Sequence, residues 1–123
     1  METIKSYTDL EQSKKLAKIL PLESADMKIL PFTEREYRIV PINDISVCGR
    51  EDEICAWSLA ALFSVLPNFI GDYGKCLYYD VGGHYCGYMV DGDFMLAIEE
   101  TNANNPVDAC VEMIIKLHEL NLI

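Results

Sequence analysis

The sequence predicts an α+β fold: an antiparallel β-meander of three to five strands, with two or three helices packed mainly on one of its faces. Residues 75–99 alternate apolar and polar side chains around glycine-containing turn signals, and residues 105–120 then place apolar side chains at helical spacing. The chain has 123 residues, half of them apolar, which is enough for one core and too few for two. We therefore expect a single domain over residues 1–123.

The first helix is expected to begin at Thr8, whose hydroxyl can cap the helix while Glu11, three residues later, completes a capping box. Pro21 should end it, because proline lacks the N–H that a helix needs. The apolar stripe of this helix is narrow and lysines occupy the rest of its surface, so it should cover an edge of the core. The stripe consists of Leu10, Leu16, Ala17 and Leu20.

Two segments in the next part of the chain, 27–30 and 37–42, have the composition of strands. Pro31 and Pro41 interrupt them, and proline cannot donate to the hydrogen-bond ladder inside a sheet. We therefore expect these segments to form either edge strands or extended loop.

Residues 53–66 predict a buried helix, since apolar side chains would fall on nearly every side of it. The carboxylates at 51–53 precede it, where they would interact favourably with the positive end of the helix dipole and supply a cap. Pro67 should end it. We expect this helix to pack on the apolar face of the sheet beside the C-terminal helix.

The C-terminal helix has clear start signals, with Asn105 as N-cap, Pro106 at the first helical position and Asp108 in the first turn. Its apolar stripe consists of Val107, Cys110, Val111, Ile114 and Leu117. His118 lies at the edge of this stripe, where a single histidine is typical of packing, so we assign it no chemistry.

The dipeptide Asp91-Gly92 between apolar segments predicts a two-residue hairpin turn, and a second turn is expected at Gly82-Gly83. The first turn sets a register that pairs Val90 with Asp93, Met89 with Phe94, Gly87 with Leu96 and Tyr85 with Ile98. The same register places Glu99 opposite His84.

Alternation along these strands separates the side chains into two faces. The face predicted to form the core carries Cys76, Tyr78, Tyr85, Gly87 and Met89. The opposite face carries Leu77, Tyr79, His84, Cys86, Tyr88 and Val90. Since this second face mixes apolar and polar side chains, it is either covered by the N-terminal segment or serves as a contact surface.

The chain is acidic, with a net charge of −10, and the excess is large in its second half. Residues 72–123 carry nine carboxylates and only two lysines, a net of −7. Such a surface repels phosphate backbones, so direct binding of nucleic acid is unfavourable. The charge favours solubility, and it would also suit an acidic inhibitor of a nucleic-acid-binding enzyme.

A cytoplasmic location is expected. The first residues lack the basic start and apolar run of a secretory signal, and no stretch approaches the roughly 18 apolar residues that cross a bilayer. Five cysteines without C-x-x-C spacing fit reduced thiols better than a disulfide framework. No cofactor is expected, since the sequence contains no glycine-rich phosphate loop or dinucleotide-binding motif.

Three residues suggest a metal site when taken together: Cys76, His84 and Cys86. The predicted register places Cys76 on the opposite face of the sheet from the other two, so the three cannot share one ion. His84 and Cys86 together with Glu99 would make a mixed trio, but one without the spacing of a zinc site. No metal site is therefore predicted.

Cys55 is a candidate nucleophile, because it would lie near the start of the predicted buried helix, where the dipole favours a thiolate. His84 could act as its base, with Glu99 or Asp93 to orient the imidazole. This order of helix cysteine, strand histidine and strand acid resembles the core of papain-like cysteine hydrolases. Against it, the carboxylates at 51–53 would raise the pKa of the thiol, and no oxyanion-binding signature is present.

Parts of the chain resemble small uncharacterised proteins encoded by prophages and mobile elements of gut bacteria. The resemblance lies in 22–27 (LESADM), 56–62 (AWSLAAL) and 105–114 (NPVDACVEMI). That family has no assigned reaction and no agreed site residues, so the resemblance implies an accessory protein that acts by contact.

These observations favour a non-enzymatic accessory protein of a prophage or mobile element that acts through protein contacts, with a partner or as a homodimer. The predicted contact surface consists of Leu77, Tyr79, Tyr88 and Val90. The apolar C-terminal residues Leu120, Leu122 and Ile123 offer a second one. Two alternatives stay open: a papain-like cysteine hydrolase that uses Cys55, His84 and Glu99, and an acidic inhibitor of a nucleic-acid-binding enzyme.

Overall fold

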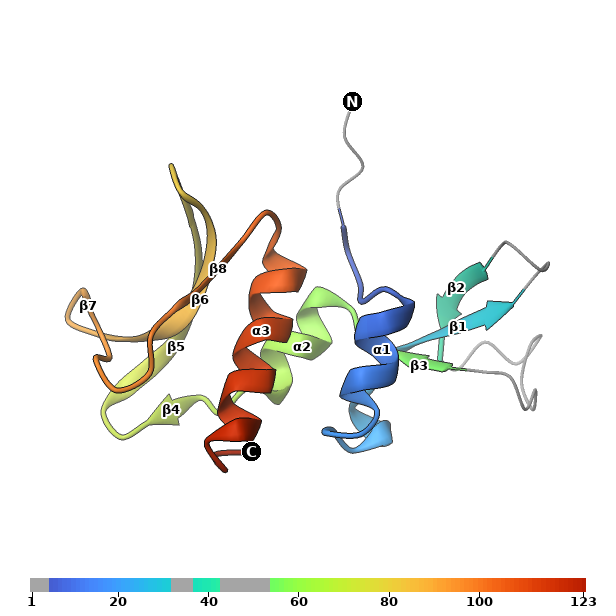
Figure 1. The fold of residues 1–123 in the computed structure, drawn as a ribbon, viewed down its shortest axis with the longest axis horizontal. Helices are drawn as coiled ribbons and strands as arrows, with labels where there is room; N and C mark the ends of the chain where they lie inside the picture. Colours follow the sequence, from blue (N-terminus) through green and yellow to red (C-terminus); the bar gives the residue numbers. More distant parts are fainter. Residues whose placement is uncertain (1–4, 32–36, 43–53) are drawn as a thin grey trace.

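Two antiparallel sheets and three α-helices make up the part of the chain that the computed structural model describes, residues 5–31, 37–42 and 54–123 (Figure 1). The predicted α+β class is confirmed. The helices are α1 (Leu10–Leu16), α2 (Leu59–Val65) and α3 (Pro106–Glu119), with a 3₁₀ turn, η1, at Leu22–Ser24. The carboxylates at 51–53, predicted to cap a helix, lie outside the described residues.

The five-stranded sheet is built around a long hairpin formed by β5 (Tyr73–Asp80) and β6 (Gly83–Val90). β4 (Phe69–Ile70) pairs with β5, while β7 (Asp93–Phe94) and β8 (Thr101–Ala103) pair with successive parts of β6. All of these pairs are antiparallel, as expected for a meander.

The predicted hairpin turn at Asp91 and Gly92 is confirmed. Both residues have positive φ angles, 50° and 84°, as a type I′ turn requires, and Val90 lies opposite Asp93. The turn between β5 and β6 lies at 81–82, one residue earlier than predicted. Moving the turn by one residue shifts the pairing of β5 with β6 by two residues. An even shift keeps every side chain on its predicted face.

Beyond β7 the predicted register is wrong. Residues 95–100 belong to no strand, although the N–H of Met95 still donates to the Tyr88 carbonyl, and pairing with β6 resumes at β8, where Asn102 rather than Ile98 lies opposite Tyr85. This excursion carries Ile98 into the core, where only 5% of it is exposed. Burial of one apolar side chain therefore competes successfully with continuation of a regular ladder.

The prediction of the core face of this sheet is also wrong. Helices α2 and α3 cover the face that carries Cys86, Tyr88 and Thr101, all of which are buried. The Thr101 hydroxyl donates to a carbonyl of α3 at 2.6 Å. The face with Tyr78 and Tyr85 points away from the helices, and two glycines on it supply no side chain to a core.

The three-stranded sheet has the order β2–β1–β3. Its strands are β1 (Met27–Pro31), β2 (Tyr37–Pro41) and β3 (Ile54–Ala56). The two segments predicted as edge strands or loop are thus both strands, and β1 is the central one. Its proline and that of β2 are the last residues of their strands, so neither interrupts the middle of the ladder.

Residues 54–56 form β3 where the sequence predicted the first turn of a helix. α2 begins only after Ser58, whose side chain accepts a hydrogen bond from the N–H of Ala61. Asp26 holds Ser58 in place by accepting hydrogen bonds from its N–H, at 2.8 Å, and from its hydroxyl. Pairing with β1 and this distant carboxylate therefore override the local helix propensity.

α1 begins one residue later than predicted, after Asp9 rather than Thr8. Asp9 and Gln12 form the capping box. Thr8 is fully buried, where its hydroxyl hydrogen-bonds that of Ser13 at 2.8 Å and accepts from the N–H of Trp57 at 3.1 Å. The helix has seven residues and does not extend to the predicted proline.

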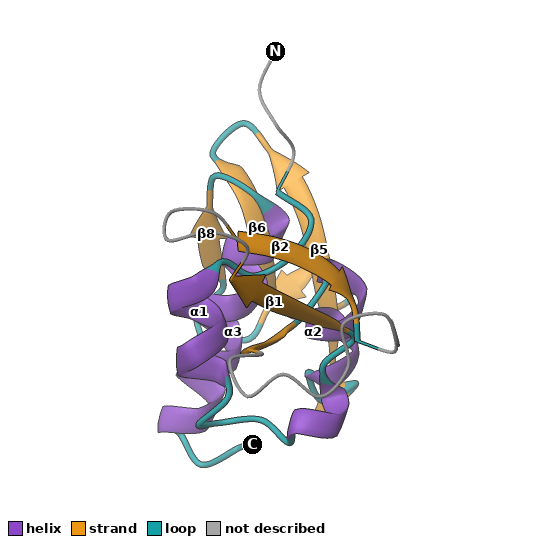
Figure 2. Ribbon diagram, turned by 90° about the vertical axis from the view of Figure 1, so that its right-hand side faces the viewer, coloured by secondary structure: helices purple, strands orange, loops and turns teal. Residues whose placement is uncertain are grey.

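α3 is the central element of the fold. It lies between the five-stranded sheet and α1, and the three-stranded sheet lies on the far side of α1 (Figures 1 and 2). Its N-cap is Asn105, as predicted, and seven of its fourteen residues are buried. None of the helices in the described ranges is long and apolar enough to cross a membrane.

Candidate functional site

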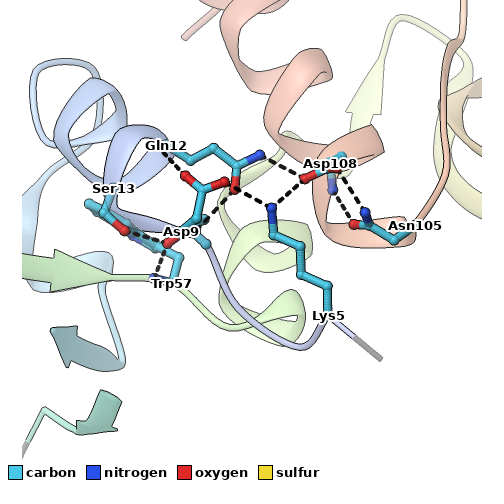
Figure 3. Close-up of polar contacts among 8 residues, drawn as sticks. Lys5, Asp9, Gln12, Ser13, Trp57, Asn105 and Asp108 are labelled. Atoms are coloured by element: carbon cyan, nitrogen blue, oxygen red, sulfur yellow. Dashed lines mark hydrogen bonds and ion pairs between the residues drawn. The ribbon is translucent and has the colours of Figure 1, made fainter. Parts of the chain in front are cut away.

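A polar cluster joins the N-terminal arm and α1 to the first turn of α3 (Figure 3). One Asp108 oxygen accepts hydrogen bonds from the Lys5 ammonium and from the Gln12 side-chain amide, both at 2.7 Å. Its other oxygen accepts from Asn105 at 2.8 Å, and Lys5 also donates to Asp9 at 3.1 Å. We call these five residues the Asp108 clamp.

The charges of the clamp stabilise each other. Burial alone would raise the pKa of Asp108, but hydrogen bonds from Lys5, Gln12 and Asn105 outweigh it and hold that pKa below its ordinary value. For Lys5, burial lowers the pKa, while hydrogen bonds to Asp108 and Asp9 raise it by more. Every charge is thus paired, so the clamp fits a structural role better than a chemical one.

Next to the clamp, α1 and α3 line an open groove of about 820 Å³. Its lining residues are Glu11, Gln12, Lys14, Lys15, Lys18, Val111, Glu112 and Ile115. A second hollow of about 450 Å³ lies beside the same lysine-bearing helix and includes Cys55 in its lining. Lys14 of α1 and Lys18, just beyond the end of this helix, line both hollows.

The residues of the predicted hydrolase are not brought together. Cys55 lies on β3, opposite Lys28 of β1, whereas His84 lies on β6, with its ring 4.9 Å from that of Tyr79. Helices α1 and α3 separate the two sheets (Figure 1). Glu99 is exposed in the 95–100 excursion and does not pair with β6. The helix dipole that was to activate Cys55 is also missing, because this residue belongs to a strand.

The predicted contact surface needs a similar correction. Tyr88 is fully buried and its hydroxyl donates to the Pro67 carbonyl at 2.7 Å, while Leu77 packs against the core. Val90 is partly buried, and only Tyr79, 73% exposed, is open to a partner. The four residues therefore do not form a continuous exposed patch.

Cysteines and histidines of the sheet are also dispersed. Cys76 lies on the opposite face from His84 and Cys86, as the register predicted. Cys86 is buried against Cys110 of α3, and a hydrogen bond between the two thiols, together with burial, raises the pKa of Cys86. Among the described residues, no group of three or more histidine, cysteine or acidic side chains could hold a metal ion.

The helix-free side of the five-stranded sheet carries a continuous row of aromatic rings. The Tyr78 ring stacks on Tyr85, with centroids 5.0 Å apart, and on Phe94, at 5.6 Å. The Phe94 ring reaches across β6 to Tyr78 because Gly87, which lies between these two residues, has no side chain. A Cβ at Gly87 would lie 2.9 Å from the Phe94 ring. Phe69 of β4 lies on this side too, beside Gly74 of β5.

We call this surface the aromatic face; it comprises Phe69, Tyr78, Tyr85, Phe94 and Glu100. Sequence reasoning placed its tyrosines together but assigned them to the core. The glycines of these strands could have indicated that this face is not the core. A face that carries two glycines among its aromatic residues has gaps that a packed core does not tolerate.

No family model matches the chain, and comparison with curated proteins and with solved structures gave no match. The resemblance to prophage proteins therefore stays a prediction.

Proposed function

We propose that this chain is a non-enzymatic accessory protein of a prophage or mobile element, and that it acts by binding another protein through its aromatic face. The observation that supports this proposal is the row of stacked rings on a sheet face that no described helix covers. If these rings belonged to the core of the chain itself, we would expect both faces of the five-stranded sheet to be buried.

The exposure of the aromatic face is consistent with a binding role. Phe69 is 68% exposed, and Tyr78, Tyr85 and Phe94 are each partly exposed. Aromatic side chains are enriched where proteins meet, since they provide large rigid contact area at low cost in conformational entropy. Exposed apolar side chains that gather on one face of a soluble protein are typical of interaction sites.

The hydrolase alternative has less support. A cysteine nucleophile requires a base within hydrogen-bond reach, and Cys55 and His84 belong to different sheets on opposite sides of α1 and α3. A binding role requires no such pair, and the aromatic face supports it.

Photo-crosslinking tests the proposal. Benzoylphenylalanine would replace Phe69 on the aromatic face, and in a matched control it would replace Tyr37 on the three-stranded sheet, which is 52% exposed. Irradiation in cells that naturally produce the protein should give an adduct of defined mass from position 69 and none from position 37. If neither position gives an adduct, or both give the same set, the aromatic face is not the contact surface.

A further inference from the structure

Glu100 is the charged member of the aromatic face. Its Cβ would lie 2.9 Å from a Cβ added to Gly87, beside the Phe94 ring, so it sits over the middle of β6. Its negative charge contributes, after burial, to the raised pKa of Tyr78. Glu100 is only partly exposed. No residue in the described ranges forms a hydrogen bond or an ion pair with its carboxylate.

Positive charge is scarce around this carboxylate. Residues 54–123 contain only two lysines and no arginine. Lys75 is on the helix-covered face, where its ammonium donates to the Phe63 and Leu66 carbonyls at the end of α2. Lys116 of α3 donates to the backbone oxygen of Glu99. Neither lysine therefore pairs with Glu100.

A carboxylate beside stacked aromatic rings has a well-defined complement. Rings attract a cation through their quadrupole, and a carboxylate forms a charge-assisted hydrogen bond with it. A planar guanidinium can do both at once, because it packs flat against a ring and still directs its N–H groups at the carboxylate. A lysine ammonium offers the charge without the planar contact.

We propose that the aromatic face binds an arginine-bearing segment of a partner protein, with one guanidinium paired to Glu100 and packed against the ring of Phe94, which lies beside Glu100 over Gly87. This inference rests on the proposed function and names the chemistry of its partner.

The test is an NMR titration of the full chain with a blocked glycine–arginine repeat peptide, followed through the ring protons of the aromatic face. Matched peptides carry lysine or the neutral isostere citrulline in place of arginine. The arginine peptide should shift the Tyr78 and Phe94 signals, the citrulline peptide should not bind, and the lysine peptide should bind more weakly. Equal binding of the lysine peptide would overturn the assignment to arginine.

Two variants with the same change in net charge separate a site from general attraction. Glu100→Gln should weaken binding of the arginine peptide by about tenfold, whereas Glu99→Gln, at the exposed neighbouring position, should change it by less than about twofold. Tyr78→Leu keeps the charge but removes the ring on which Phe94 stacks, so it should also weaken binding, by about fivefold. Equal effects of the two charge variants, or no effect of Tyr78→Leu, would refute the site.

The outcomes also separate this inference from the proposed function. An adduct from position 69 without binding of the arginine peptide removes the arginine site and keeps the contact surface. Binding of the peptide without any adduct in cells shows that the face can hold an arginine, but it contradicts the proposal that the protein uses this face to bind a partner in cells. Backbone amide spectra of each variant, compared with those of the unmodified chain, show whether a loss of binding reflects a loss of folding.

Discussion

The Asp108 carboxylate accepts a 2.7 Å hydrogen bond from the Lys5 ammonium, although 103 residues separate the two in the chain. Gln12 donates to the same oxygen, so a single carboxylate links the N-terminal arm and α1 to α3. The side chains of Lys5 and Asp108 are only 25% and 32% exposed, which limits screening by solvent. Since α1 has just seven residues and would not be stable alone, its position depends on such tertiary contacts.

We expect Asp108→Asn to lower the free energy of unfolding by about 1 kcal/mol, because it removes a partly buried ion pair and weakens the clamp. Urea denaturation followed by fluorescence of Trp57, a fully buried residue, measures this change. Glu112→Gln is the control, since it removes the same charge from an exposed position one turn along α3. Equal destabilisation by both variants would show that the clamp has no special role.

The clamp should also make stability depend on pH. The folded pKa of Asp108 lies below its ordinary value of 3.8, so its contribution is complete above that value and disappears as the pH falls through the folded pKa. The difference in unfolding free energy between the unmodified chain and Asp108→Asn should therefore be constant from pH 6 to about 5 and shrink below about 4. Urea titrations at each pH measure it, and a difference that persists unchanged at about pH 3 would contradict the prediction.

Signals that act within a few residues were predicted correctly. The N-cap at Asn105 and the turn at Asp91 and Gly92 depend on the local geometry of cap and turn residues, which the sequence reports directly. Residues 54–56 were assigned to a helix because their apolar pattern fits one. Their pairing with β1 depends on a partner strand almost thirty residues earlier, which the local pattern does not reveal.

The candidate site shows the same division. Alternation placed Tyr78 and Tyr85 on one face of the sheet correctly, because that depends only on the period of a strand. Which face meets the helices depends on how α3 packs, and α3 buries Cys86 and Tyr88 instead. The pairing of Cys55 with a base failed for a related reason: residue order does not show that two sheets lie on opposite sides of the helices.

Gly87 should be essential for the aromatic face. In Gly87→Ala the new Cβ would lie 2.9 Å from both the Phe94 ring and the Glu100 Cβ, so at least one of them must move. We expect a loss of about 1–3 kcal/mol in stability and displaced Phe94 ring signals. Gly74→Ala is the matched control on the same face, because its Cβ would meet only Phe69, at an ordinary 3.5 Å.

Urea denaturation and aromatic NMR spectra measure both glycine variants. The prediction is contradicted if the two substitutions have the same effect on stability, or if the ring signals of Phe94 are unchanged in Gly87→Ala.

The cysteines should show graded reactivity that distinguishes binding from catalysis. Cys86 and Cys110 are fully buried, so alkylation should reach them only through unfolding. Cys76 is partly buried, and burial first, with the nearby Glu100 charge, raises the pKa of its thiol. Its alkylation midpoint should therefore lie above the ordinary value of about 8.5, so that it reacts slowly near neutral pH.

Cys55 decides between the two functions. It lies on a strand, without a helix N-terminus to favour its thiolate, and His84 is on the other sheet, so its alkylation rate should not exceed that of an ordinary thiol. Site-resolved mass spectrometry of alkylated peptides across a pH series measures all four described cysteines in one experiment. Fast reaction of Cys55 with a midpoint well below about 8.5 would restore the hydrolase hypothesis, because only an activated thiolate reacts in that way.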